Sequence, residues 1–353
     1  MTIPLEASIL GHDKLIERFR RGVAAGRLAS SFLFVGPPGI GKRTLALKLA
    51  QALLCETHPE EKLEACETCA ACQQVTAGSH PDLQIISKPA DRSFIPMEAF
   101  IGDREHRMRE GLCHDISLKP FCGGRKIAII DDADYLNQEG ANCLLKTLEE
   151  PPPKSLIILI GTSEPKQLPT IRSRCQIVRF APLPTATVAQ LLESTGRVAD
   201  PKEATQLAEL AGGSLSRAVE FSVSETREMR DKLLELLSSE SDAAQAVREL
   251  NSFVDAAGKD APRRRQRLRV LIHLAIEFYQ QLLHTLTGRD AIGDPAMIEA
   301  VTRGRVSISD VEVAANCLER CLDAQAHVES NANQATLIEC WLDDLGGYAC
   351  GRS

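Results

Sequence analysis

Short runs of consecutive apolar residues alternate with helical patterns in the first half of the chain. The apolar runs are Ser31–Val35, Ile127–Ile130 and Leu156–Ile160. Thr44–Leu54 and Asn137–Glu150 instead space their leucines as an amphipathic helix does, and Pro151 ends the second of these helices. Because strands that are apolar throughout are buried on both faces, the runs favour a parallel sheet covered by helices. Residues 1–180 are therefore predicted to form an α/β domain.

The strand pattern stops after Pro182, and the rest of the chain has the pattern of helices. Thr185 to about Val223 holds two short helical patterns, joined around Gly212-Gly213-Ser214. From about Glu225 onward the chain is amphipathic and almost wholly helical. We therefore expect three domains: the α/β domain at 1–180, a small helical domain at 181–224 and an all-α domain at 225–353.

Composition places the chain among soluble globular proteins. It has 353 residues, of which 44% are hydrophobic and 25% charged, enough for two or three domains. A net charge of −7 argues against a protein that coats nucleic acid, although a local basic face is compatible with it. Met1–Ala7 has no secretion signal, and the longest aliphatic run, Leu156–Ile160, is too short to span a bilayer. We expect a cytoplasmic protein without membrane contact.

A glycine-rich loop joins the first apolar strand to the first helical segment. Its pattern, Gly36-Pro37-Pro38-Gly39-Ile40-Gly41-Lys42, is that of a P-loop, whose backbone N–H groups surround phosphates while the lysine meets their charge. The alternative is a tight connection without a ligand. Arg43 stands where serine or threonine normally holds Mg²⁺, and Thr44 lies about 100° further round the helix. The loop is predicted to bind ATP with weak Mg²⁺ dependence and to hydrolyse it poorly.

Two further features have the form of ATPase residues. Asp131 and Asp132 end an apolar strand, where a P-loop ATPase has a carboxylate for Mg²⁺ and, in many cases, a glutamate that orients water. Asp132 is one methylene shorter than that glutamate, so we favour a vestigial magnesium site over a pair of solvated acids. Arg174, between Ser173 and Cys175, is either a surface arginine or an arginine finger, which requires a planar and permanently charged group.

Four of the twelve cysteines are clustered directly after the P-loop helix. They are Cys55, Cys66, Cys69 and Cys72. Four thiolates in a tetrahedral array form a closed structural Zn²⁺ site, with no open position for catalysis. The alternative is a stripe of reduced cysteines on a helix, but polar neighbours such as Glu67 do not suit a buried stripe. We favour a zinc module at about residues 55–72. His58 and His80 are spare candidates, and each is interpreted as a surface or loop residue.

Two basic stretches are candidate nucleic-acid contacts. The run Arg263–Arg267 opens a helical segment and is interpreted as a solvated or inter-subunit face. Arg104, Arg107 and Arg109 form the second stretch, which lacks interleaved aromatic residues. A role in DNA binding is therefore only weakly indicated for either.

Together these motifs resemble those of the AAA+ clamp-loader subunits of bacterial DNA polymerase III. Besides the P-loop and the cysteines, the resemblance includes His80–Asp82, Asp131–Asp134, Ala141–Pro152, Gly161–Pro165, Ser173–Cys175 and Asn331–Asn333. It covers almost the whole chain, and the string Leu-Leu-Lys-Thr-Leu-Glu-Glu-Pro-Pro followed by Ser-Arg-Cys is specific to this family. The resemblance implies an AAA+ P-loop domain, a small helical lid domain and a helical collar that joins a five-subunit ring.

Within that family the resemblance is to the delta-prime type. The gamma and tau motor subunits have threonine and glutamate where this chain has Arg43 and Asp132. In the motor subunits the second sensor arginine directly follows a Gly-Ser-x pattern. In this chain Gly213-Ser214-Leu215 is followed by Ser216, so that Arg217 comes one position later. These departures imply a subunit with little ATPase activity of its own. A gamma- or tau-like motor is the alternative, and a free-standing zinc-containing DNA-binding ATPase is a more distant one.

The resemblance also implies site residues and partners. The nucleotide would contact Gly36, Gly39, Gly41, Lys42, Arg43, Thr44, Asp131, Asp132, Thr162 and Arg217. Arg174 would act in trans, on nucleotide held by a neighbouring motor subunit. The implied partners are the gamma or tau and delta subunits, the sliding clamp and primed DNA, within the polymerase III holoenzyme.

Overall fold

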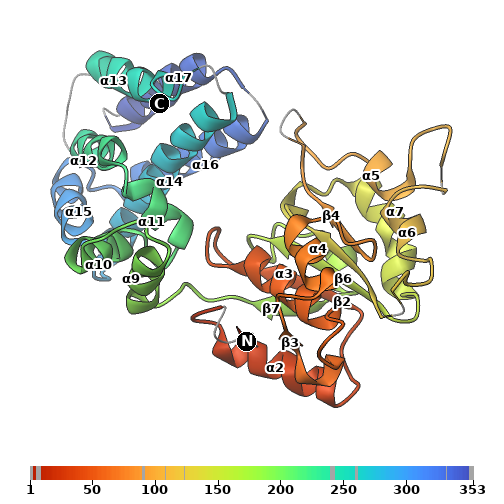
Figure 1. Cartoon of the computed structure of the whole chain (residues 1–353). Helices are drawn as coiled ribbons and strands as arrows, with labels where there is room; N and C mark the ends of the chain where they lie inside the picture. The colour runs from red at the N-terminus through yellow and green to blue at the C-terminus, as the bar shows by residue number, and fades with distance from the viewer. Residues whose placement is uncertain are drawn as a thin grey trace. The chain divides into compact units, whose positions relative to one another are not determined.

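The computed structural model describes residues 3–4, 9–89, 92–107, 109–122, 124–238, 243–258, 261–330 and 332–349. The chain divides into two compact units, one of Met1–Leu191 with Gly213–Ser216 and one of Leu192–Gly212 with Arg217–Ser353 (Figure 1). The predicted lid segment, 181–224, is thus shared between them, and the three-domain division stays a prediction. Asn331 and most of Met1–Ala7, both used in the sequence analysis, lie outside the described residues.

The first unit is built on a five-stranded parallel sheet. Its strands are β2 (Ser31–Val35), β4 (Leu83–Ile86), β5 (Lys126–Ile130), β6 (Ser155–Gly161) and β7 (Gln176–Arg179), in the spatial order β4-β5-β6-β2-β7. All residues of β2 and β6 are buried, as their continuous apolar sequences predict. A separate antiparallel pair joins β1 (Ile3–Pro4) to β3 (Glu64–Ala65). The predicted parallel α/β architecture is confirmed.

Helices cover both faces of this sheet. On one face Leu33, Ala128 and Ile157 pack in a core with the helices listed next. These are α5 (Glu98–Ile101), α6 (Leu112–Asp115), α7 (Gln138–Glu149) and α8 (Pro169–Arg172). On the other face Phe19 of α2 (Asp13–Ala24) packs edge-on against Phe32 and at a tilt against Phe34, with ring centroids 5.1 and 5.8 Å apart. The P-loop helix α3 (Lys42–Leu53) contacts α4 (Ala70–Ala77) and β6. The short 3₁₀ turns are Glu60–Lys62 and Ala133–Tyr135.

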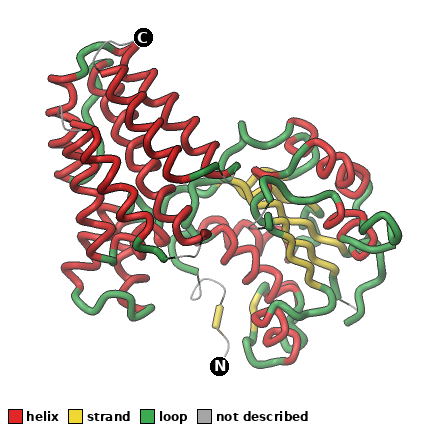
Figure 2. The backbone as a smooth tube through the Cα atoms, turned by 90° about the horizontal axis from the view of Figure 1, so that it is seen from above, coloured by secondary structure: helices red, strands yellow, loops and turns green. Residues whose placement is uncertain are grey.

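The second unit is helical throughout its described residues, and Figure 2 shows the strands confined to the other part of the chain. Its helices are α10 (Pro201–Leu210), α12 (Ser224–Ser238), α13 (Ala243–Asp255), α14 (Ala261–Leu286), α15 (Pro295–Ser307), α16 (Val311–Glu329) and α17 (Gln334–Ala349). Helices α9 (Thr185–Ser194) and α11 (Leu215–Phe221) straddle the division between the units. The long helix α14 packs against α16, and Trp341 and Phe278 are fully buried in their common core. Among the described helices, none combines the length and apolar character that a membrane span requires.

Candidate nucleotide and metal sites

The glycine-rich loop has the backbone conformation that a P-loop needs. It follows the last residue of β2 and ends at Gly41, whose φ of 95° starts α3. Gly39 has a φ of 74°, and a Cβ there would lie 2.3 Å from the Ser214 hydroxyl oxygen. Only glycine satisfies both conditions at this position. The loop N–H groups at the start of α3 are therefore available at the carboxyl edge of the sheet, where parallel α/β proteins bind ligands.

The lysine of the loop is buried against the loop itself. The Lys42 Nζ donates hydrogen bonds to the carbonyl oxygens of Gly36 and Pro37, at 2.6 and 2.5 Å. Desolvation lowers the pKa of Lys42 to about 8, against the opposing effect of the Asp134 and Asp131 carboxylates. An ionised phosphate is a stronger hydrogen-bond acceptor than a backbone carbonyl. A phosphate that enters the loop would therefore replace the two carbonyl oxygens as acceptor for the Lys42 ammonium group.

An ion pair lies where the predicted magnesium site would be. The Arg43 Nη1 is 3.0 Å from Asp131 Oδ2, with the arginine side chain 56% exposed and the aspartate 16% exposed. Arg43 is the second residue of α3 and Asp131 directly follows β5, so the pair joins the two segments that hold Mg²⁺ in a P-loop ATPase. The guanidinium is permanently charged and offers no oxygen ligand. The charge of Asp131 is therefore balanced by the Arg43 guanidinium, without a metal ion.

The second acid of the pair belongs to a turn. Asp132 has a φ of 57°, and its Oδ2 accepts a hydrogen bond from the Lys88 backbone N–H at 3.4 Å. Burial raises the pKa of Asp132, and the neighbouring Asp131 charge raises it further. The two carboxylates thus have different partners: the first binds Arg43, and the second binds backbone.

A third acid, Asp134, connects the ends of β5 and β6. It accepts hydrogen bonds from the Thr162 N–H at 3.0 Å and from the Thr162 hydroxyl at 2.5 Å, and a further one from Gln167 Nε2. A Cβ on Gly161 would lie 2.7 Å from an Asp134 oxygen, which explains glycine at that position. The hydroxyl of Thr162, predicted to contact nucleotide, is therefore held by a carboxylate at the same edge of the sheet.

The turn Gly213–Ser216 belongs to the first unit and lies against the P-loop. The Ser214 hydroxyl donates to the Pro38 carbonyl oxygen at 3.0 Å, and the Leu215 N–H donates to that of Gly39 at 3.0 Å. Arg217, one residue further on, belongs to the second unit. There it forms a bidentate pair with Glu277, at 2.5 and 2.7 Å.

The clustered cysteines converge on one point. Cys55 follows α3, Cys66 follows β3, and Cys69 and Cys72 lie at the start of α4. Their four sulfur atoms lie within 4.8 Å of one another, and those of Cys66 and Cys72 are 3.9 Å apart. Tetrahedral zinc with Zn–S bonds of about 2.3 Å sets neighbouring sulfurs about 3.8 Å apart. The group can therefore hold a metal ion, and it is no stripe on one helix.

The surroundings favour the thiolate of Cys66 and oppose that of Cys72. The Cys69 N–H donates to Cys66 Sγ at 3.2 Å, and the Cys72 N–H donates to Cys69 Sγ at 3.4 Å. A hydrogen bond from the Thr57 side chain is the main cause that lowers the pKa of Cys66 to about 5, whereas burial raises the pKa of Cys72. A divalent cation would allow all four sulfurs to be ionised together. In the described residues the group includes neither His58 nor His80.

Arg174 is held at the surface of the first unit. Its Nε and Nη2 both donate to Oε1 of Glu149, the last residue of α7, with the Nε contact at 2.7 Å. Its Nη1 donates to the Thr170 carbonyl oxygen at 2.9 Å and to the Ser173 hydroxyl at 3.1 Å. The Arg174 side chain remains 30% exposed. The fold thus fixes a guanidinium at the surface by three neighbours.

Comparison with known proteins finds similar sequences for the first part of the chain. Residues 11–184 match the family described as DNA polymerase III, delta subunit. The delta-prime subunit of DNA polymerase III from Pseudomonas aeruginosa is 35% identical over 208 residues, which are 59% of this chain and 60% of that protein. The delta-prime subunit from Bacillus subtilis is 32% identical over 225 residues, 63% of each chain. These matches support a delta-prime type of DNA polymerase III subunit.

The chain is also similar to tau subunits. The tau subunit of Escherichia coli DNA polymerase III is 30% identical over 218 residues, which are 60% of this chain and 32% of that protein. The matched part is thus less than two thirds of the length of each of these relatives. Among solved structures, a gamma subunit-related protein of DNA polymerase III from Thermotoga maritima has a TM-score of 0.40 and 17% identity, and covers 94% of this chain and 99% of its own.

Several residues around the loop were not predicted from the sequence. The Nε2 atom of His12, at the start of α2, lies 2.6 Å from the Ile40 carbonyl oxygen. Ser214 contacts the loop, Asp134 acts on the charge of Lys42, and Gln167 binds Asp134. Asp134 had a signal, because it ends the motif Asp131–Asp134. The others carry none, since their partners are distant in sequence.

Proposed function

We propose that this chain is a delta-prime-like subunit of the DNA polymerase III clamp loader that hydrolyses little or no ATP. The Arg43–Asp131 ion pair carries the proposal, because it places a protein cation where a motor subunit needs Mg²⁺. In this role the chain would help the gamma or tau and delta subunits to load the sliding clamp on primed DNA, in the cytoplasm. The delta-prime relatives support this role for the chain.

Three ligand and contact roles follow from the proposal. The P-loop would bind the phosphates of ATP without depending on Mg²⁺, because Lys42 and Arg43 supply positive charge. Cys55, Cys66, Cys69 and Cys72 would hold a structural Zn²⁺. Arg174 would stabilise the charge that develops on the γ-phosphate in the site of a neighbouring motor subunit.

The test is steady-state ATP hydrolysis by the isolated chain, followed by reconstitution. We expect negligible turnover, with or without clamp and primed DNA, and a stoichiometric complex with the motor and delta subunits. Turnover comparable to that of a motor subunit would support the gamma- or tau-like alternative. Failure to join the complex would support a free-standing protein.

A further inference from the structure

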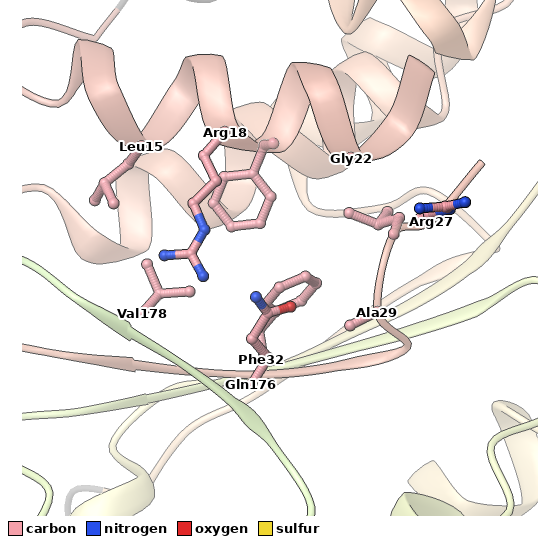
Figure 3. A pocket seen from close by; sticks show the side chains of 10 residues that line it. Leu15, Arg18, Gly22, Arg27, Ala29, Phe32, Gln176 and Val178 are labelled. Atoms are coloured by element: carbon pink, nitrogen blue, oxygen red, sulfur yellow. The ribbon is translucent and has the colours of Figure 1, made fainter. Parts of the chain in front are cut away.

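A small pocket lies between α2 and the edge strand β7 (Figure 3). Its volume is about 200 Å³, and its walls include Leu15 and Phe19 of α2, Phe32 of β2 and Val178 of β7. Phe32 lies near the amino end of β2, whereas the P-loop follows the carboxyl end of that strand. The volume is below the roughly 300–1,000 Å³ of pockets for drug-sized ligands. It suits one or two side chains of a peptide.

A glycine on α2 keeps this pocket open. Gly22 lines the pocket from the interior of the helix, and its φ is not in the left-handed region. A Cβ at Gly22 would meet nothing within 4 Å. Neither the backbone conformation nor a close neighbour therefore requires glycine at this position. Glycine is nevertheless unfavourable in the interior of a helix. A larger side chain at this position would extend into the free space.

The cationic side chain of Arg18 also lines the pocket. Figure 3 shows the Arg18 guanidinium reaching from α2 towards Val178 and Gln176. In the described part of the chain, Arg18 has neither a hydrogen bond nor an ion pair, whereas Arg21 lies 3.6 Å from Glu17. An anionic group on a ligand would supply the missing partner.

Strand β7 offers the third element of the site. It pairs with β2 on one side and, within the described residues, has no strand on its other side. Gln176 and Val178 both line the pocket, two residues apart on one face of β7. A free strand edge can pair with an extended peptide, whose alternate side chains then lie on one face of the sheet.

We propose that the pocket and the edge of β7 bind an extended segment of a partner protein in which an acidic and an apolar residue are two positions apart. The peptide backbone pairs with β7, the apolar side chain enters the space beside Gly22, and the carboxylate binds Arg18. The two side chains share a face because a strand alternates its side chains. This site is separate from the P-loop, the cysteines and Arg174.

The test uses sixteen labelled pentapeptides with blocked ends. Each has Asp or Glu two positions from Leu, Ile, Val or Phe, in either order, with serine elsewhere. Fluorescence anisotropy measures their binding to the full chain and to three variants. Arg18→Glu reverses the cation, Gly22→Leu fills the pocket, and Arg21→Glu is the matched control on the same helix. Circular dichroism confirms that each variant is folded, which the open space at Gly22 favours.

We expect saturable binding of at least one peptide. Arg18→Glu should weaken it about tenfold or more, since it removes a charge-assisted hydrogen bond and adds repulsion. Gly22→Leu should abolish it, and Arg21→Glu should change it by less than about twofold. The proposal is wrong if no peptide binds, if all three variants bind alike, or if replacing the acid by lysine leaves affinity unchanged.

Discussion

At the residue scale, the exchange of a hydroxyl for Arg43 changes what the P-loop can do. In a P-loop ATPase the hydroxyl and the strand-end aspartate hold Mg²⁺ together. Here the guanidinium neutralises Asp131 directly, at 3.0 Å. A metal ion would have to displace a permanently charged group and would find one oxygen ligand fewer. Nucleotide affinity should therefore depend little on Mg²⁺.

Titration calorimetry with ATP tests this dependence. For the natural chain we expect affinities in Mg²⁺ and in EDTA to agree within about threefold, which is less than the change expected from one good interaction. Arg43→Thr should make binding depend on Mg²⁺, because it frees Asp131 and supplies an oxygen. It should not restore hydrolysis while Asp132 is bound to the Lys88 backbone. Arg303→Thr, on exposed surface of the second unit, is the control. Strong Mg²⁺ dependence of the natural chain would contradict the prediction.

The buried lysine of the loop makes phosphate binding depend on pH. Desolvation lowers the pKa of Lys42 to about 8, and a bound phosphate would raise it again. Above pH 8 the free lysine is increasingly neutral, whereas the complex keeps it charged. Binding should therefore take up a proton, and affinity should fall by up to about tenfold per pH unit from pH 8 upward.

Calorimetry at pH 9 in two buffers of different ionisation enthalpy measures this proton uptake. Phosphate groups are fully ionised at that pH, so the proton must come to the protein. We expect an uptake approaching one proton at pH 9 and almost none at pH 6.5. Lys42→Met should abolish the uptake. Tight binding at pH 9 with the same heat in both buffers would refute the assignment.

At the scale of elements, we expect the segment from Cys55 to α4 to depend on its four sulfurs for stability. Its secondary structure consists of a 3₁₀ turn, a two-residue strand and the start of a short helix. Elements as short as these are marginally stable by themselves. Metal binding would then contribute directly to folding. We expect one zinc per chain by elemental analysis. In Cys69→Ser we expect the zinc to be lost and the unfolding temperature to fall by roughly 5–10 °C. A fall of this size corresponds to about 2–3 kcal/mol in the free energy of unfolding for a unit of this size.

The matched control for that experiment is Cys340→Ser, since Cys340 is an exposed cysteine outside the group. It should keep both the metal and the unfolding temperature. A natural chain that is metal-free and equally stable would show that the sulfurs only pack together.

The elements also show how far the sequence predicts this fold. The three continuous apolar runs became β2, β5 and β6, because interior strands of a parallel sheet must be apolar on both faces. The outer strands β4 and β7 have four residues each and were not predicted. A strand at the edge of a sheet need not be apolar throughout, so its sequence lacks a continuous apolar run. The four-cysteine group was predicted from the ligand type, the spacing and the polar neighbours of the cysteines. The Arg43–Asp131 pair was not, because its partners are 88 residues apart and periodicity reports only local order.

At the scale of the whole molecule, the proposed role requires the chain to act on a site that it does not itself contain. Arg174 suits that role because its guanidinium is partly exposed and fixed by Glu149, Thr170 and Ser173. A fixed orientation reduces the entropy lost when the group meets a phosphate. The contact with Glu149 has a second effect. The carboxylate competes with the phosphate for the same donors, so Glu149 should position Arg174 and also weaken its hold on the ligand.

The last prediction separates these effects in the reconstituted complex. Arg174→Ala should leave assembly intact yet lower DNA-stimulated ATP hydrolysis by the neighbouring motor by up to about 10³-fold. Arg174→Lys should recover little, because an ammonium group lacks the planar fork. Glu149→Gln removes the competing charge but keeps an acceptor, so it should lower KM more than it changes kcat. The neighbouring Glu150→Gln is the control, with wild-type kinetics expected. An unchanged ATPase rate in Arg174→Ala would mean that Arg174 is a surface residue whose contact with Glu149 serves only the fold of the first unit.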